Sequence, residues 1–162
     1  MPTRCTCILT AESGSNVTGM LTLVQASDES PVVITGELKG LVSGKHGITV
    51  NTYGDLSDGA QSCGPIFNPF TQHHGAPTDE ARMVGSLGNI LATEDAGTTV
   101  VHIVDPVVKL LGPHSIIGRS IVVYSAEDDA GRGGHALSLT TGNAGPRVCA
   151  GVVGLATSVV TM

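Results

Sequence analysis

Eight short runs rich in valine, isoleucine and leucine, separated by glycine-containing turns, constrain the fold of this 162-residue chain most. Aromatic residues make up only 2% of the chain and tryptophan is absent, so a core must be built from aliphatic side chains. β-branched residues favour strands, and glycine favours turns because it tolerates positive φ. The runs predict strands at 6–9, 17–25, 32–38, 46–53, 83–92, 98–104, 116–124 and 149–156. Eight strands of this kind predict an all-β sandwich or barrel.

Two long stretches, 54–82 and 125–147, interrupt this pattern and contain several glycines and prolines. Loops of this length in a compact domain are usually functional, so a site is expected there. The chain contains no repeat or linker, which predicts a single domain over 1–162. Its core is expected at about 5–156, followed by a short C-terminal extension at 157–162.

The charge and hydropathy of the chain argue against two classes of partner. The formal net charge of −6 disfavours binding to nucleic acid or to an anionic membrane. No run of about 18 apolar residues is present, so no membrane-spanning helix is expected. The first residues lack the apolar stretch of a secretory signal, and a cytoplasmic location is therefore expected.

Four cysteines offer two different arrangements. Cys5 and Cys7 lie on one face of the first strand and are too close in sequence to bond directly, so free thiols are expected. Cys63 and Cys149 are far apart in sequence and could close a long loop by a disulfide. Such a bond would be unusual in a reducing cytosol.

The histidines and carboxylates alone indicate no enzyme. The six histidines form no H-x-H or H-E-x-x-H pattern, and the chain has no C-x-x-C. His73 and His74 are adjacent, and neighbouring side chains in an extended segment diverge, so they are not expected to share a metal ion. The acidic pairs at 79–80 and 128–129 are adjacent in sequence, whereas catalytic carboxylates converge across a cleft.

Six strings of residues, taken in their order and spacing, resemble animal intracellular Cu/Zn superoxide dismutases. They lie at 64–69, 74–80, 84–89, 115–119, 128–135 and 141–147. The resemblance extends from about Cys7 to Ala156. It implies an eight-stranded Greek-key β-sandwich or barrel with two long loops.

The family holds copper and zinc through six histidines, one of which bridges the metals, and one aspartate. By resemblance, the paired histidines of the fourth strand correspond to Thr49 and Asn51. The bridging histidine corresponds to Ile66, and the copper histidine at the end of the seventh strand to Tyr124. Copper that cycles between oxidation states needs several imidazole ligands, and these four residues supply none.

The zinc set changes in the same way. One histidine is kept as His74, while the next histidine corresponds to Met83 and the aspartate to Ser86. Structural zinc normally takes four N, S or O ligands, so neither copper nor zinc is expected as a cofactor here, although the family uses both. Two remnants persist by resemblance. Asp128 corresponds to the aspartate that bridges a copper ligand and a zinc ligand, and here it is expected either to bond His74 or to cap a turn. Arg147 corresponds to the arginine that attracts and orients superoxide, and without copper it is expected to tie a loop.

The cysteines of the family disulfide correspond to Ala60 and Ala150. Cys63 lies three residues after the first position and Cys149 one residue before the second. A shift of one residue along a strand turns the side chain to the other face. A Cys63–Cys149 disulfide would therefore need a local rearrangement, and it is left open.

The resemblance also implies a dimer face whose positions here remain apolar or small. They are Ile8, Tyr53, Gly54, Ile117, Gly118, Val152 and Leu155. A homodimer is expected, or a heterodimer with a true superoxide dismutase or its copper chaperone. From the altered ligand positions we expect a catalytically inactive homologue that acts by protein binding. The alternative is a superoxide dismutase, or another redox protein, with residual or altered copper or zinc binding.

Overall fold

Strict alternation of buried and exposed side chains explains why the first run forms a strand. In β1 (Thr3–Ala11), the side chains of Cys5, Cys7 and Leu9 are buried, and the residues between them are not. Side chains alternate between the two faces of a strand, so this spacing places one row of apolar groups in the core. The same alternation holds along β2 and β3.

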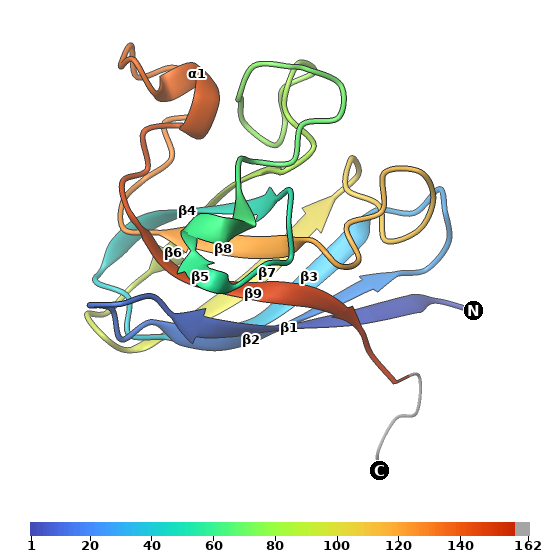
Figure 1. Cartoon of the computed structure of the whole chain (residues 1–162), viewed down its shortest axis with the longest axis horizontal. Coiled ribbons are helices and arrows are strands. Elements are labelled where there is room, and N and C mark those ends of the chain that lie inside the picture. The colour runs from blue at the N-terminus through green and yellow to red at the C-terminus, as the bar shows by residue number, and fades with distance from the viewer. Residues whose placement is uncertain (158–162) are drawn as a thin grey trace.

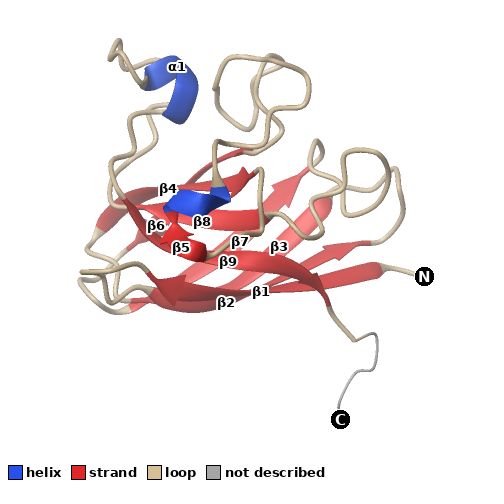
Figure 2. Cartoon of the chain, viewed as in Figure 1, coloured by secondary structure: helices blue, strands red, loops and turns tan. Residues whose placement is uncertain are grey.

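The structure is a computed structural model that describes residues 1–157. Strands and helices are marked in Figures 1 and 2. The strands are β1 (Thr3–Ala11), β2 (Thr18–Gln25), β3 (Val32–Lys39), β4 (Gly44–Asn51), β5 (Ser57–Ala60), β6 (Ser86–Ala92), β7 (Thr98–Asp105), β8 (Ser120–Tyr124) and β9 (Arg147–Leu155). The helical segments are η1 (Gln61–Cys63) and α1 (Ser138–Thr141). Within the described range, no helix has the length and apolar character needed to cross a bilayer.

The eight longer strands form one antiparallel sheet in the order β6-β4-β8-β9-β1-β2-β3-β7. The sheet curls into a nearly closed barrel, with β6 and β7 at its two ends (Figure 1). The β1–β9 and β4–β8 pairs join segments that lie far apart in the sequence. The all-β barrel predicted from the sequence is confirmed.

Two strands begin later than the sequence predicted. The run expected to start at residue 83 becomes β6 only at Ser86, because a turn closed by the Ser86 N–H and the Met83 carbonyl precedes it. The run expected to start at residue 116 becomes β8 only at Ser120, after a turn from Ile116 to Arg119. In both places an apolar run continues into a turn. The extension expected at 157–162 lies outside the described residues except for Thr157.

The barrel interior is filled by aliphatic side chains, as the scarcity of aromatic residues required. Its largest fully buried members include Leu9, Leu21, Leu23, Ile34, Leu38, Leu41, Ile48, Leu110, Ile116 and Ile121. A second, smaller buried cluster contains Ala60, Cys63, Val122, Tyr124, Ala144 and Ala150. This smaller cluster joins β8 and β9 to η1 and to the second long loop, beside the candidate site.

The two long loops rise from the same side of the barrel (Figure 2). The first covers residues 64–85 and the second covers residues 125–146, which include α1. They are joined by a hydrogen bond of 2.9 Å from the His74 N–H to the Leu139 carbonyl. The sequence placed a functional site in these two segments, and their polar side chains do converge over β4, β6 and β8.

Candidate functional site

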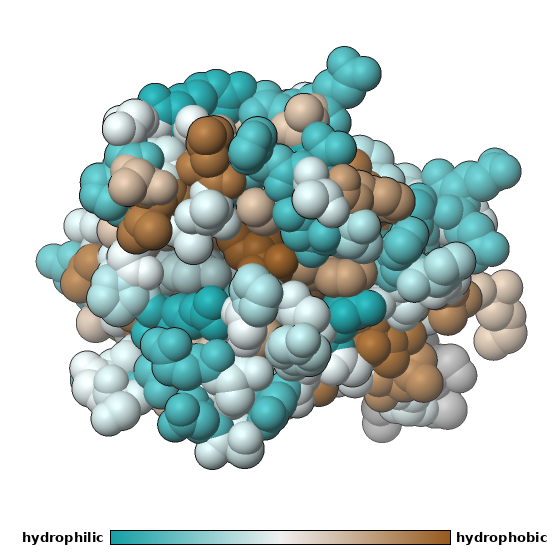
Figure 3. All heavy atoms as spheres, turned by 45° about the horizontal axis from the view of Figure 1, so that its top comes forward, coloured by the Kyte–Doolittle hydropathy of each residue, from teal (hydrophilic) through white to brown (hydrophobic). Residues whose placement is uncertain are grey.

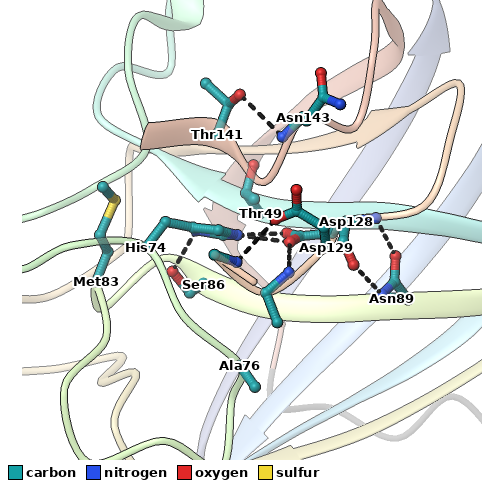
Figure 4. A network of polar contacts seen from close by, with 12 residues as sticks. Thr49, His74, Ala76, Met83, Ser86, Asn89, Asp128, Asp129, Thr141 and Asn143 are labelled. Carbon is teal, nitrogen blue, oxygen red and sulfur yellow. Dashed lines mark hydrogen bonds and ion pairs between the residues drawn. The ribbon is translucent and has the colours of Figure 1, made fainter. Parts of the chain in front are cut away.

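His74 is the centre of a buried polar cluster that draws together both loops and the barrel (Figure 4). His74 comes from the first loop, Ser86 is the first residue of β6, and Asp128 comes from the second loop. Ser86 Oγ lies 2.8 Å from His74 Nδ1. His74 Nε2 lies 2.7 Å from both carboxylate oxygens of Asp128. All three side chains are buried.

The direction of these hydrogen bonds follows from the donors available. An ionised carboxylate only accepts hydrogen bonds, so Nε2 of His74 carries the hydrogen that it donates to Asp128. A neutral ring then has a lone pair at Nδ1, which accepts the hydroxyl hydrogen of Ser86. Both ring nitrogens of His74 are therefore occupied by protein partners.

Asp128 is itself held on the barrel by Asn89 of β6. The Asp128 N–H donates to Asn89 Oδ1 at 2.7 Å, and Asn89 Nδ2 donates to the Asp128 carbonyl at 2.9 Å. Asp128 Oδ1 also accepts the Ala130 N–H at 2.8 Å. These bonds fix the carboxylate beneath the loop. Asp128 therefore takes both of the roles left open for it, the bond to His74 and the turn bond to Ala130, and the anchor at Asn89 was not foreseen.

A second polar cluster lies at the positions that the resemblance assigned to copper. Thr49 Oγ1 donates to Asn51 Oδ1 at 2.6 Å and lies 2.9 Å from the Tyr124 hydroxyl. Asn51 Nδ2 donates to the Gly64 carbonyl at 2.9 Å. Because Thr49 uses its one hydrogen on Asn51, the Tyr124 hydroxyl must be the donor to Thr49. These buried polar groups therefore satisfy one another.

Two apolar side chains complete the set of altered positions. Ile66 and Met83 are only 5% and 7% exposed. They line an open hollow of about 450 Å³ together with Phe67 and Pro69. Apolar surface is visible among the polar residues on this loop-bearing side of the molecule (Figure 3).

Arg147, the first residue of β9, is tied beside the second cluster. Its Nη1 donates to the Ala60 carbonyl at 2.8 Å, and its Nη2 donates to the Gly64 carbonyl at 2.7 Å. The Gly64 carbonyl also accepts Asn51 Nδ2. The guanidinium is thus half-buried and fixed in direction, one carbonyl away from the Thr49–Asn51–Tyr124 cluster.

An ion pair between Arg82 of the first loop and Asp105, the last residue of β7, was not foreseen from the sequence and ties the loop to the barrel. Arg82 Nη1 donates to Asp105 Oδ2 at 2.7 Å, and both side chains are only 1% exposed. Asp105 Oδ1 accepts the N–H groups of Val107 and Val108, as an aspartate at a turn often does. The available signal was an aspartate placed just before Pro106 at the end of an apolar run.

The four cysteines are free thiols, and the bridge left open between Cys63 and Cys149 is not formed. Cys149 faces the barrel core with Cys5 and Cys7, whereas Cys63 lies in the smaller cluster with Ala150. The one-residue shift along β9 therefore puts the two sulfur atoms on opposite faces of the strand. Burial raises the pKa of the Cys7 and Cys149 thiols to about 12.

The side chains at the altered positions do not fit copper or zinc as the family holds them. No group of three or more His, Cys, Asp or Glu side chains within residues 1–157 could hold a metal ion. Both ring nitrogens of His74 are hydrogen-bonded, Nδ1 to Ser86 and Nε2 to Asp128. The Thr49 hydroxyl donates to Asn51, and the Tyr124 hydroxyl donates to Thr49. His73, which is exposed, does not join either cluster.

The residues expected at a dimer face do lie together. Ile8, Tyr53 and Leu155 are more than half exposed, and Val152 is 36% exposed. A Cβ built at Gly54 would lie 2.1 Å from the Gly118 carbonyl oxygen and 3.0 Å from a Val152 methyl group. The Gly118 N–H donates to the Val153 carbonyl on β9, and Ile117 is half-buried beside it. Gly54, Gly118 and Val152 therefore lie in contact, and Ile8, Tyr53 and Leu155 are exposed apolar residues from the same set.

Comparison with known proteins gives two findings. The family model described as copper/zinc superoxide dismutase matches residues 17–153. A superoxide dismutase [Cu-Zn] from Cryptococcus neoformans var. grubii is 46% identical over 151 residues, which cover 93% of this chain and 97% of that relative.

The second finding contradicts our expectation of an inactive homologue that acts by protein binding. A relative of nearly the same extent carries the name of the enzyme, so homology favours the dismutase function that was kept as the alternative. The expectation of inactivity gave more weight to the altered metal-ligand positions than to the likeness of the whole chain to a dismutase. With a family model that spans most of its length and a relative this similar, the chain belongs to the copper/zinc superoxide dismutase family.

Proposed function

We propose that this protein is a superoxide dismutase, an enzyme that converts superoxide to hydrogen peroxide and oxygen. We propose further that it binds metal differently from the other members of its family. The observation that carries the proposal is the 46% identity with a superoxide dismutase [Cu-Zn] over 97% of that relative's length. A shared fold alone would not support it, since one fold hosts many functions. Identity this high over a whole domain is a stronger argument than the fold.

The setting of Arg147 supports superoxide as the substrate. Two carbonyl oxygens fix its guanidinium, which places a permanent positive charge at the base of the loops. The chain as a whole carries a formal charge of −6, which repels an anion. A local cation offsets that repulsion where the anion must arrive, and so raises the local concentration of superoxide.

The way the electron moves is the part of the proposal that departs from the family. Dismutation oxidises one superoxide ion and reduces another, and copper supplies that electron exchange in the relatives. Here the family positions hold hydroxyl, amide, thioether and aliphatic groups, which do not fit copper. We therefore derive no step through copper or zinc, and assign to this chain only the attraction and orientation of the anion.

The test is a superoxide assay and an elemental analysis on one sample of the full chain, expressed with excess copper and zinc. Superoxide removal should rise in proportion to protein concentration and should fall severalfold in Arg147→Ala. Arg4→Ala, which removes the same charge from β1, is the matched control and should retain the rate. A full chain that removes no superoxide above the protein-free rate would reject the proposal, whatever metal it carries.

The assembly and location of the protein are part of the same proposal. The protein forms a homodimer through the apolar surface around Ile8, Gly54, Gly118, Val152 and Leu155. A heterodimer through that surface, with a true superoxide dismutase or its copper chaperone, is the alternative assembly. The exposure of these residues, and the contacts among Gly54, Gly118 and Val152, support either form. The protein acts in the cytoplasm.

A further inference from the structure

Three separate parts of the fold meet at the imidazole of His74. The first loop supplies the ring, β6 supplies Ser86, and the second loop supplies Asp128. Two hydrogen bonds between Asn89 and Asp128, and one from the His74 N–H to the Leu139 carbonyl, also join these segments. Together the two ring contacts make a direct cross-link between both loops and the barrel.

The cross-link occupies the atom that a metal would need. Asp128 fixes the hydrogen on Nε2, so the only lone pair of a neutral ring is at Nδ1. In a neutral ring that lone pair accepts the hydrogen of the Ser86 hydroxyl, whose Oγ lies 2.8 Å away. A zinc ion could bind Nδ1 only by displacing Ser86, and the neighbouring Met83 offers a thioether, which is a weak ligand for zinc.

The chain is closed tightly around the His74–Asp128 pair. A Cβ built at Gly142 would lie 2.1 Å from Asp128 Oδ1 and 2.7 Å from His74 Nε2. Gly142 also has a φ of +72°, which favours glycine. The second loop therefore packs its backbone directly onto the pair, and the bare glycine permits that approach.

We propose that the Ser86–His74–Asp128 hydrogen bonds hold the two loops on the barrel without a metal ion, at positions that the resemblance assigns to zinc ligands and the residue that contacts them. These two hydrogen bonds act together with the Asn89–Asp128 and His74–Leu139 bonds, so the order of the loops does not depend on metal supply. The inference goes beyond the proposed function and does not depend on it, since it concerns the folding of the loops and not the fate of superoxide.

The first test uses the unmodified full chain. The unfolding midpoint and the hydrogen exchange of segments 72–76 and 126–130 are measured after treatment with EDTA and after addition of zinc sulfate. We expect the same midpoint and the same exchange rates in both conditions. A zinc ion in each purified chain, with a lower midpoint and faster exchange in EDTA, would overturn the proposal.

The second test removes one hydrogen bond. Ser86→Ala leaves His74 Nδ1 buried without a donor, so the unfolding midpoint should fall by on the order of 5 °C and exchange in both segments should rise at least tenfold. Ser120→Ala is the matched control. Ser120 is also a fully buried serine at the start of a strand, and its hydroxyl has no hydrogen-bond partner within the described residues.

The control variant should keep the midpoint and the exchange rates of the parent chain. Equal exchange in Ser86→Ala and Ser120→Ala would overturn the proposal. If Ser86→Ala does not fold, the EDTA and zinc comparison on the parent chain decides alone. Neither readout involves superoxide, so a failed dismutase assay would leave this inference standing, and a failure here would leave the dismutase proposal standing.

Discussion

The Tyr124 hydroxyl lies 2.9 Å from Thr49 Oγ1 and joins the last residue of β8 to β4. The resemblance assigns both positions to copper-binding histidines of the family. In this chain the two side chains bond each other, and the Thr49 hydroxyl donates in turn to Asn51 Oδ1. The inner end of the site is therefore a satisfied hydrogen-bond network, which stabilises the fold without a cation.

Replacing Tyr124 by phenylalanine should test that network. Tyr124→Phe removes the donor to Thr49 while keeping the ring, so the free energy of unfolding should fall by about 1–2 kcal/mol. Urea denaturation measures the change. Tyr53→Phe, which removes an exposed hydroxyl, is the control and should leave the free energy unchanged. Equal stabilities of the two variants would show that the Tyr124 hydroxyl does not contribute.

Breaking the buried Arg82–Asp105 ion pair should be costly. Arg82→Ala leaves the Asp105 carboxylate buried without its partner, and such losses destabilise proteins by about 3–5 kcal/mol. Chemical denaturation again measures the effect. Arg132→Ala breaks the ion pair with Asp79 in which the arginine is exposed, and it should change stability little. Similar losses in both variants would contradict the structural role assigned to Arg82.

The buried thiols give a prediction for pH and for chemical reactivity. Burial raises the pKa of Cys7 and Cys149 to about 12, so these groups stay protonated in the folded protein when an exposed thiol would ionise. Unfolding then releases protons at high pH. Their contribution to stability is complete below pH 9, the pKa of an exposed thiol, and is lost as the pH rises from about 9 towards 12.

A thiol-reactive dye at pH 8 measures the same feature. The folded protein should react slowly, because all four cysteines are buried, and the unfolded protein should release four thiols per chain. Denaturation without reductant keeps any disulfide intact. A count of two thiols in the unfolded protein would reveal the Cys63–Cys149 bond, contrary to the structure.

The proposed dimer face predicts that one charged substitution should separate the subunits. Leu155 is 70% exposed on β9, and an aspartate there would place a charge in an apolar contact. Sedimentation equilibrium should show a dimer for the parent chain and a monomer for Leu155→Asp. Val100→Asp, on β7 and also 70% exposed, should remain a dimer. A parent chain that sediments as a monomer would contradict the proposed assembly.

The barrel was predictable because each of its strands is indicated by residues that are neighbours in the sequence. Runs rich in valine, isoleucine and leucine, separated by glycine-containing turns, predicted all eight strands of the sheet. The starts at Ser86 and Ser120 were missed because apolar residues continue through the preceding turns, and hydrophobic pattern alone does not separate a strand from an adjoining turn. The opposite faces taken by Cys63 and Cys149 follow from a shift of one residue, which the sequence did indicate.

The site was less predictable because its contacts join residues that are distant in sequence. Resemblance placed Asp128 beside the site but left open whether it bonds His74 or caps a turn. No local pattern could pair Ser86 with His74 or Arg82 with Asp105, since each pairing depends on how the first loop folds back. The expected loss of function was wrong for another reason. Six altered positions were weighed more heavily than the likeness of the whole chain to a protein named superoxide dismutase [Cu-Zn].

The most direct test of the dismutase proposal is the decay of superoxide followed by pulse radiolysis with the purified full chain. Superoxide alone disappears by a second-order reaction with itself. We predict that added protein makes the decay first-order, with a rate proportional to protein concentration and lower in Arg147→Ala. Second-order decay that is unchanged by the protein would contradict the account.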